Sequence, residues 1–222
     1  SIVSRQEPTT IMIYRDDKPL HEVESDPCYL FHFLNGYREG ERYVVDLVRM
    51  DAFPTAEDVR ALLYDRVPKN PIYGVLTRYE IDPATGEVER RELFPHPTEF
   101  PMVNPEYAGR AYRYGWAIAG DPDETTDEGT IHGIAKFDLE SGLALRRSIF
   151  PDFPGEPLFV PDPTRPAAED GGWLVMLTFN VEARRTELSV RDAATLDELY
   201  RAALPVPVHL GFHGAWVGSE ST

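Results

Sequence analysis

The sequence predicts an all-β protein that forms an arc of a β-propeller. Twenty prolines and sixteen glycines separate short runs in which apolar and polar residues alternate, as they do in β-strands. Residues 79–95, 137–151 and 188–205 share one pattern: a strand, a turn that contains Asp, a second strand and a closing proline. A repeat of about 50 residues that holds about four strands is typical of a propeller blade.

The other expected elements follow in chain order. Strands are predicted at residues 10–14, 28–34, 42–48, 114–119 and 173–179, and a helix only at residues 56–66, where the apolar side chains have helical spacing. Residues 28–54 fit the repeat loosely as an earlier unit, so we count about four blades or part-blades. Four blades could close into a small ring, but the irregular first unit and the strand near residue 10 favour an arc of a larger ring.

The chain is expected to be one unit. No low-complexity linker divides residues 1–222, which we interpret as a single domain or a part of one. The acidic segments 121–128 and 161–172 are interpreted as solvated outer connections that carry no site. The longest apolar runs, such as residues 173–179, are far shorter than the roughly 20 residues that a membrane helix needs.

The composition restricts the partners and the compartment. The 22 basic and 38 acidic residues give a net charge of −16, which argues against a nucleic acid or an anionic membrane surface as partner. An apolar or neutral ligand is easier to accommodate, and a peripheral contact with a membrane is left open. The single cysteine, Cys28, cannot form an internal disulfide and indicates a reducing compartment, most simply the cytoplasm.

The common signatures of hydrolases, nucleotide-binding proteins and zinc enzymes are missing. The chain has no Gly-x-Ser-x-Gly, no phosphate-binding glycine loop, no Cys-x-x-Cys and no His-Glu-x-x-His. Its six histidines are His21, His32, His96, His132, His209 and His213. With one cysteine, a metal site in this chain would have nitrogen and oxygen ligands.

His32 lies in a strand where its direction suits a metal ligand. Strand alternation places His32 on the face opposite Phe31 and Phe33. If these two aromatic residues face the core, His32 points to the other side or to the propeller axis. The spacing by itself also fits a polar side chain on a half-exposed strand.

His213 lies in a frame of small and aromatic residues. Gly211 and Gly214 would let the backbone pass close to another group, and Phe212 and Trp216 could keep a metal dry. We interpret His213 as a metal ligand. Taken alone, a histidine beside aromatic residues is more often a hydrogen-bonded core residue.

Five motifs occur in order over about residues 28–217. They are residues 31–37 with 44–48; Arg90-Arg91-Glu92-Leu93 with Glu99-Phe100-Pro101; residues 109–115; Pro154-Gly155-Glu156-Pro157 with residues 168–173; and Gly211-Phe212-His213-Gly214. Together they resemble the carotenoid cleavage oxygenase family, whose members include carotenoid, apocarotenoid and stilbene dioxygenases. The resemblance covers nearly the whole chain and matches the C-terminal portion of the family.

The resemblance implies a seven-bladed propeller with Fe(II) on its axis, held by four histidines, three of which are hydrogen-bonded by glutamates. His32 and His213 correspond to the third and fourth ligands, and Glu99 and Glu156 to two of the glutamates. Neutral imidazoles suit Fe(II), and outer carboxylates offset its charge and fix the tautomer of each ring. The implied reaction is cleavage of a conjugated carbon–carbon double bond by O2 to two carbonyl products.

The chain also departs from the family pattern. Two of the four histidine ligands and one glutamate belong to an N-terminal half that we do not find, so that half is an expected partner and the activity of this chain alone is doubtful. His21 does not resemble either missing motif. His96, His132 and His209 lie outside the ligand motifs and are interpreted as surface or packing residues.

Two alternatives stay open. A non-catalytic propeller fragment or degenerate paralogue could bind a partner or an apolar ligand without turnover. Another all-β enzyme, such as a glycosidase, would need a pair of carboxylates at an open cleft, which Glu99 and Glu156 could supply.

Overall fold

The computed structural model describes residues 7–53, 55–63, 74–120, 131–206, 208 and 211–218. The strands are β1 (Thr9–Arg15), β2 (Lys18–Ser25), β3 (Tyr29–Glu39), β4 (Arg42–Met50), β5 (Gly74–Asp82), β6 (Glu87–Val103), β7 (Tyr114–Ala119), β8 (Gly133–Asp138), β9 (Leu143–Ser148), β10 (Phe153–Pro154), β11 (Leu158–Pro161), β12 (Gly172–Asn180), β13 (Arg185–Asp192) and β14 (Glu198–Ala203). The helices are α1 (Ala56–Leu63) and a 3-10 turn at Pro105–Tyr107. The strands predicted from the sequence correspond to β1, β3, β4, β7 and β12.

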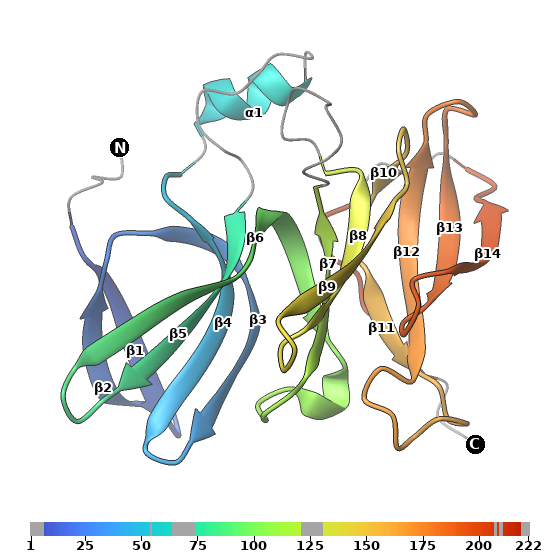
Figure 1. The fold of residues 1–222 in the computed structure, drawn as a ribbon. Coiled ribbons are helices and arrows are strands. Elements are labelled where there is room, and N and C mark those ends of the chain that lie inside the picture. The colour runs from blue at the N-terminus through green and yellow to red at the C-terminus, as the bar shows by residue number, and fades with distance from the viewer. Residues whose placement is uncertain are drawn as a thin grey trace.

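Antiparallel sheets stand side by side in an open arc, with β1 and β2 at one end and β14 at the other (Figure 1). The strand orders are β1-β2, β3-β4-β5-β6-β7-β8-β9 and, with β11 also paired to β12, β10-β12-β13-β14. The middle sheet divides into two four-stranded units at β6. The described residues therefore form three blades and one hairpin. The third blade also has four strand positions, because β10 and β11 pair one after the other with the same edge of β12. The predicted fold, an all-β propeller arc, is confirmed.

Strand β6 belongs to two blades, which the sequence did not predict. We expected this strand to end at Pro95, but β6 continues to Val103. It pairs with β5 as far as Thr98 and with β7 from Thr98 onward, and its register shifts between Phe94 and Pro97. A proline has no N–H to donate to a ladder, so it is tolerated where the strand changes its pairing partner.

The predicted repeat has one structural cause, a turn that recurs in all three blades. The Oδ1 atoms of Asp82, Asp138 and Asp192 each accept hydrogen bonds from the backbone N–H groups two and three residues later. The residue four positions after each Asp has a positive φ: Gly86 (77°), Gly142 (71°) and Leu196 (63°). Leu196 replaces glycine where its side chain is fully buried, so packing offsets the cost of the left-handed backbone.

Three apolar clusters fill the spaces between neighbouring sheets. The first includes Val23 and Tyr79 and joins the β1-β2 hairpin to the first blade. The second includes Leu34, Phe94 and Phe137 and lies between the first and second blades. The third is centred on Trp116 and joins the second blade to the third, where the Trp116 indole N–H also donates to the Ala193 carbonyl at 2.8 Å.

The helix and the loops differ partly from expectation. Helix α1 begins at Ala56 as predicted and is capped by Thr55, whose hydroxyl accepts from the Asp58 N–H; residues 64–66 of the predicted helix lie outside the described residues. So does the predicted outer connection 121–128. No helix in the described part of the chain is both long and apolar enough to span a membrane.

The connection 161–172 is not the solvated loop that we predicted. Glu169 accepts hydrogen bonds from the backbone N–H groups of Arg113 and Tyr114, both at 2.7 Å. Asp170 forms an ion pair with Lys136 of the neighbouring blade at 2.5 Å. The acidic side chains of this loop thus hold two blades together, because they lie opposite N–H groups and a cation that the sequence places far away.

The loop after β6 is held against the first blade by buried polar groups. The Asn35 amide donates to the carbonyls of Tyr107 and Arg110. Next to it, buried Asp46 forms a bidentate ion pair with Arg78, in which both hydrogen bonds are 2.8 Å long. Asp46 also accepts a short hydrogen bond from the Tyr112 hydroxyl. The hydrogen bond with Asp46 raises the pKa of Arg78, and burial raises the pKa of Tyr112.

Candidate metal centre

The four predicted site residues come from four different segments and meet at one place. His32 lies on β3, Glu99 on β6, Glu156 between β10 and β11, and His213 in the C-terminal segment 211–218. Strands β3, β6 and β10 with β11 each begin a blade, and β6 contacts both β3 and β11 across the arc. Each blade therefore contributes its first strand to the site.

Each histidine is hydrogen-bonded by one glutamate. His32 Nδ1 lies 2.5 Å from Glu99 Oε2, and His213 Nδ1 lies 3.1 Å from Glu156 Oε1. The two histidines face one another through their other nitrogens, with 3.2 Å between the Nε2 atoms and 78° between the ring planes. The resemblance implied hydrogen bonds from glutamates to histidines without saying which residues pair, and here Glu99 meets His32 and Glu156 meets His213.

The protonation of the rings follows from their partners. An ionised carboxylate only accepts hydrogen bonds, so each Nδ1 carries the hydrogen, and in the neutral rings each Nε2 presents a lone pair. Two lone pairs 3.2 Å apart repel unless a positive charge lies between them. Imidazole nitrogens bind a metal at about 2.0–2.1 Å, so two ligands of one ion are at most about 4.2 Å apart. The pair fits this limit.

The glutamates also bind the backbone beside the histidines. Glu99 Oε2 accepts a second hydrogen bond, from the Phe100 N–H at 2.7 Å, and Glu156 Oε2 accepts from the Gly214 N–H at 2.7 Å. Glu99 is buried, and among the described residues its Oε1 has no hydrogen-bond partner. Both carboxylates are therefore held in place before any metal binds, and Glu156 also holds the segment that carries His213.

The described residues provide two candidate ligands and no more. Among them, no group of three or more His, Cys, Asp or Glu side chains is arranged to hold a metal ion. The His213 side chain is 59% exposed and that of His32 is 22% exposed, so the two nitrogens lie at an open face. Any further ligand would approach from that face.

The surroundings of His213 differ from the prediction. Phe212 and Trp216 are 80% and 58% exposed, so they do not form a dry shell in this chain. A side chain at Gly211 would meet open space, whereas one at Gly214 would lie 3.2 Å from Leu158 Cδ1. Only the second glycine is needed for close approach. The predicted role of the first fails because no described atom lies close to Gly211.

The aromatic residues on either side of His32 do not face the core. The argument for His32 held only if Phe31 and Phe33 face the core, but both are exposed, and Leu34 is buried instead. The register of β3 with β4 shifts on both sides of Phe33, so the simple alternation does not hold there. Phe100, which sequence reasoning missed, packs on both rings, with centroids 5.1 Å from His32 and 5.8 Å from His213.

The other described histidines lie away from the site. His132 is buried between Phe150 and Phe153, and its Nδ1 lies 2.9 Å from the Asp152 carbonyl oxygen. His96 packs against Phe94, and His21 against Tyr43. His209 lies outside the described residues. The packing interpretation of His96 and His132 agrees with these contacts.

An open propeller arc in which two histidines from separate segments are each hydrogen-bonded by a glutamate defines the class of protein. The chain belongs to the RPE65 family, described as retinal pigment epithelial membrane protein, whose model matches residues 2–218. The resemblance to carotenoid cleavage oxygenases is therefore confirmed at the level of the family.

Comparison with curated relatives supports the same family assignment. The chain is 32% identical over 212 residues to an apocarotenoid-15,15'-oxygenase of Synechocystis, covering 93% of this chain and 42% of the relative. It is 30% identical over 204 residues to a lignostilbene-alpha,beta-dioxygenase isozyme of Sphingomonas paucimobilis, covering 85% and 41%. The chain thus spans less than half the length of the curated relatives it matches.

A solved structure supports the fold. The crystal structure of cobalt-substituted Synechocystis apocarotenoid oxygenase superimposes with a TM-score of 0.86 at 30% identity, covering 97% of this chain and 45% of that one. That relative holds cobalt in its crystal structure. Over the part that it spans, this chain has the propeller fold of that relative.

Proposed function

We propose that this chain supplies part of the active site of a non-heme Fe(II)-dependent oxygenase, which cleaves a conjugated carbon–carbon double bond with O2 to give two carbonyl products. One observation carries the proposal: two Nε2 atoms 3.2 Å apart, each on a ring whose Nδ1 is bound by a glutamate. The relatives that act on apocarotenoids and lignostilbenes support a carotenoid, apocarotenoid or stilbene-type substrate.

Four residues of this chain would have distinct roles at the metal. His32 and His213 would hold the iron, while Glu99 and Glu156 would keep each Nδ1 protonated and offset the positive charge. The chemistry that iron supplies when bound is activation of O2, so that the double bond breaks and each carbon receives one oxygen atom. Tyr29 packs edge to face on Phe31 and Phe53, and the Phe31 ring lies 6.4 Å from the His32 ring. These three side chains would offer an apolar wall to a conjugated substrate.

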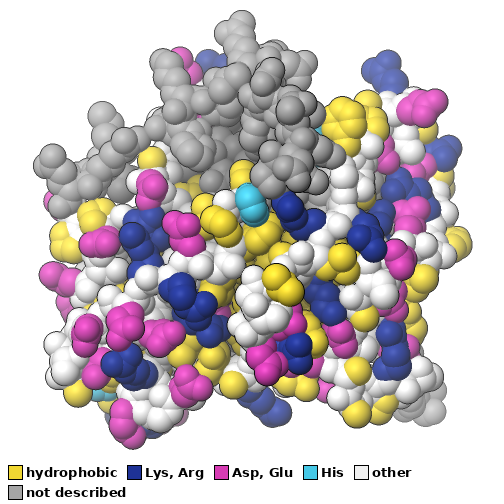
Figure 2. All heavy atoms as spheres, in the orientation of Figure 1, with side chains coloured by type: hydrophobic (Ala, Val, Ile, Leu, Met, Phe, Trp, Pro, Cys, Tyr) yellow, Lys and Arg dark blue, Asp and Glu magenta, His cyan; other side chains and the backbone are white. Residues whose placement is uncertain are grey.

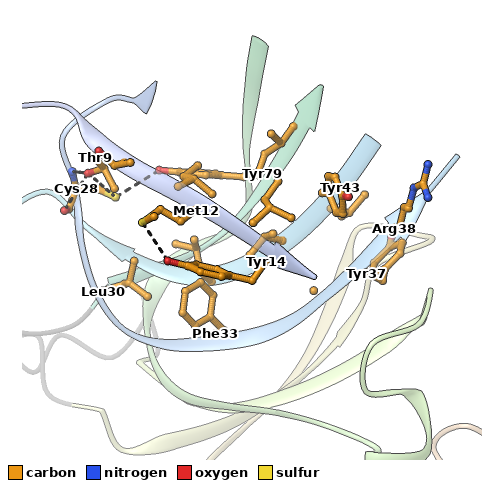
Figure 3. Close-up of a pocket in the computed structure, with 18 residues that line it drawn as sticks. Thr9, Met12, Tyr14, Cys28, Leu30, Phe33, Tyr37, Arg38, Tyr43 and Tyr79 are labelled. Atoms are coloured by element: carbon orange, nitrogen blue, oxygen red, sulfur yellow. Dashed lines mark hydrogen bonds between the residues drawn. The ribbon is translucent and has the colours of Figure 1, made fainter. Parts of the chain in front are cut away.

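We also propose that residues beyond this chain complete the propeller domain and the ligand set, as an N-terminal half. The β1-β2 hairpin has half the strands of each blade, and β1 pairs only with β2 among the described residues. A cavity of about 510 Å³ opens between this hairpin and the first blade, with Met12, Tyr14 and Phe33 at its exposed rim (Figure 3). Two further strands paired to the edge of β1 would complete the hairpin to a four-stranded blade.

The competing functions are less well supported. A glycosidase needs two free carboxylates, but Glu99 and Glu156 are both hydrogen-bonded to histidines. A non-catalytic propeller that binds a partner or apolar ligand is the second candidate, favoured by the presence of two ligands only. On the face in Figure 2, basic and acidic side chains intermingle. The proposal therefore includes no nucleic-acid partner. The free Cys28 supports a cytoplasmic location.

The test of the proposed function is product analysis. The protein that carries the complete ligand set is loaded with Fe(II) and supplied with an apocarotenoid or a stilbene in ¹⁸O₂. We expect two carbonyl products in equal amounts, with label in each. A protein that binds iron yet forms no product from either substrate class would support the non-catalytic alternative.

The chain alone should bind Fe(II) weakly. Two imidazoles are half of the expected ligand set, and the His213 side chain is 59% exposed. We expect substoichiometric iron after anaerobic incubation and desalting, measured by mass spectrometry of the metal. A tight complex with one iron per chain would contradict the half-site, unless its mass showed two chains sharing the ion.

Replacing Glu99 or Glu156 with Gln should weaken the site without removing it. Gln keeps the size of the side chain but deletes the charge, and such changes typically cost about 10- to 100-fold in metal affinity or activity. Iron affinity and turnover are measured in the complete protein. The control is Glu106→Gln, because Glu106 is an exposed acid on the 3-10 turn. This substitution should change neither iron affinity nor turnover. If Glu99→Gln or Glu156→Gln abolished iron binding as completely as the loss of a histidine, that carboxylate would instead be a ligand of the metal.

A further inference from the structure

The backbone at Phe100 leaves regular strand geometry in the centre of the site. Phe100 has a φ of 50°, a left-handed conformation that residues other than glycine rarely adopt. The register between β6 and β7 shifts between Glu99 and Met102. Neighbouring side chains in a regular strand point to opposite faces. Because of this bulge, the side chains of Glu99 and Phe100 both contact His32.

Phe100 contacts both imidazoles and one of the two carboxylates that bind them, that of Glu99. Its N–H donates to Glu99 Oε2, the same atom that accepts from His32 Nδ1. Its ring lies against His32 with 36° between the planes and meets His213 nearly edge-on, at 76°. The ring also packs on the apolar cluster between the second and third blades, so it is supported from behind.

A hydrogen bond to Nδ1 does not by itself fix an imidazole. The ring torsion of histidine is broad and roughly two-fold, so one bonded nitrogen still allows the ring to swing. A flat wall against the ring removes that freedom. Phe100 provides such a wall to His32 and packs nearly edge-on against His213, and the direction of each Nε2 depends on the ring plane.

We propose that Phe100 is a positioning residue, whose ring orients the imidazoles of His32 and His213 so that their Nε2 atoms converge, and whose left-handed backbone keeps Glu99 on His32. The inference rests on the proposed function where it treats these nitrogens as metal ligands. The ring orientation itself is a property of the metal-free chain and can be measured there.

The test uses three substitutions and a matched control. Phe100→Gly deletes the ring and tolerates the left-handed backbone, so it tests the ring alone. Phe100→Leu keeps apolar volume without a flat face and serves if the glycine variant does not fold. Phe100→Tyr restores the flat ring. The control is Phe153→Leu, which removes a ring 4.5 Å from His132, a histidine outside the site.

Two readouts separate this inference from the proposed function. In the metal-free chain, exchange of the His32 Nδ1–H with water is measured by NMR at constant pH. We expect at least ten-fold faster exchange in Phe100→Gly and Phe100→Leu, and less than two-fold change in Phe100→Tyr and Phe153→Leu. The affinity for Co²⁺, measured by titration of its visible absorption, should fall at least ten-fold in the same two variants.

The outcomes are distinct. If folded Phe100→Gly or Phe100→Leu keeps both the exchange rate and the Co²⁺ affinity within two-fold of the parent, Phe100 does not position the rings. If the parent itself binds no Co²⁺ at any concentration, the proposed function loses its support, and the exchange rates alone decide the role of Phe100.

Discussion

Iron binding and double-bond cleavage should both fall to background when His32 or His213 is replaced by alanine in the protein that carries the complete ligand set. Each substitution removes a nitrogen that lies 3.2 Å from its counterpart and leaves a glutamate without its ring. The loss should exceed the about 10- to 100-fold cost of changing an outer carboxylate. Iron per chain is measured by mass spectrometry and cleavage by chromatography of the carbonyl products.

The controls are the other described histidines with partly exposed side chains. His21 packs on Tyr43 and His96 on Phe94, both outside the site. The substitutions His21→Gln and His96→Gln should therefore leave iron content and turnover within a few-fold of the parent. The assignment of the metal to His32 and His213 is lost if either control abolishes iron binding while His213→Ala retains it.

Asp46→Ala should cause the largest loss of stability in the described chain. Asp46 is fully buried and holds both Arg78 and Tyr112. Removing one partner of a buried ion pair leaves a charge without compensation, which costs about 3–5 kcal/mol. We expect a loss of this size in the free energy of unfolding, measured by urea denaturation followed by circular dichroism.

A surface ion pair provides the matched control. Arg42 and Glu89 are joined at 3.0 Å by side chains that are both largely exposed. Exposed pairs contribute little because water and salt screen them, so Glu89→Ala should not change the urea midpoint beyond error. Equal effects of Asp46→Ala and Glu89→Ala would show that the buried pair does not anchor the loop after β6.

Local pattern was sufficient for the recurring turns and for most of the strands, but not for β2, β10 or β11. The Asp-containing turn was visible in the sequence because its hydrogen bonds join an Asp to residues two, three and four positions later. Such contacts depend on neighbouring residues only. The same holds for β7, which the alternation predicted to its exact ends, and for the start of α1 beside its Thr55 cap.

The identity of the site residues also came from the sequence, through motifs. His32, Glu99, Glu156 and His213 were named from their frames, and all four meet in the structure. The frame around Glu99 contained Phe100, but the motif assigned a role only to the carboxylate. The left-handed backbone that turns the phenyl ring toward the histidines has no signature in composition or alternation.

Contacts between blades were decided by tertiary structure alone. His32 and Glu99 are 67 residues apart, and Glu156 and His213 are 57 residues apart, so no local pattern records which pairs meet. The exposure of Phe212 and Trp216, the passage of β6 from one blade to the next, and the anchoring role of Glu169 have the same origin. The sequence by itself determined most of the strands, the recurring turns and the chemistry of the side chains, because these depend on local hydrogen bonds and residue type. The convergence of two Nε2 atoms depended on how the apolar faces of separate blades pack together, which only the folded chain decides.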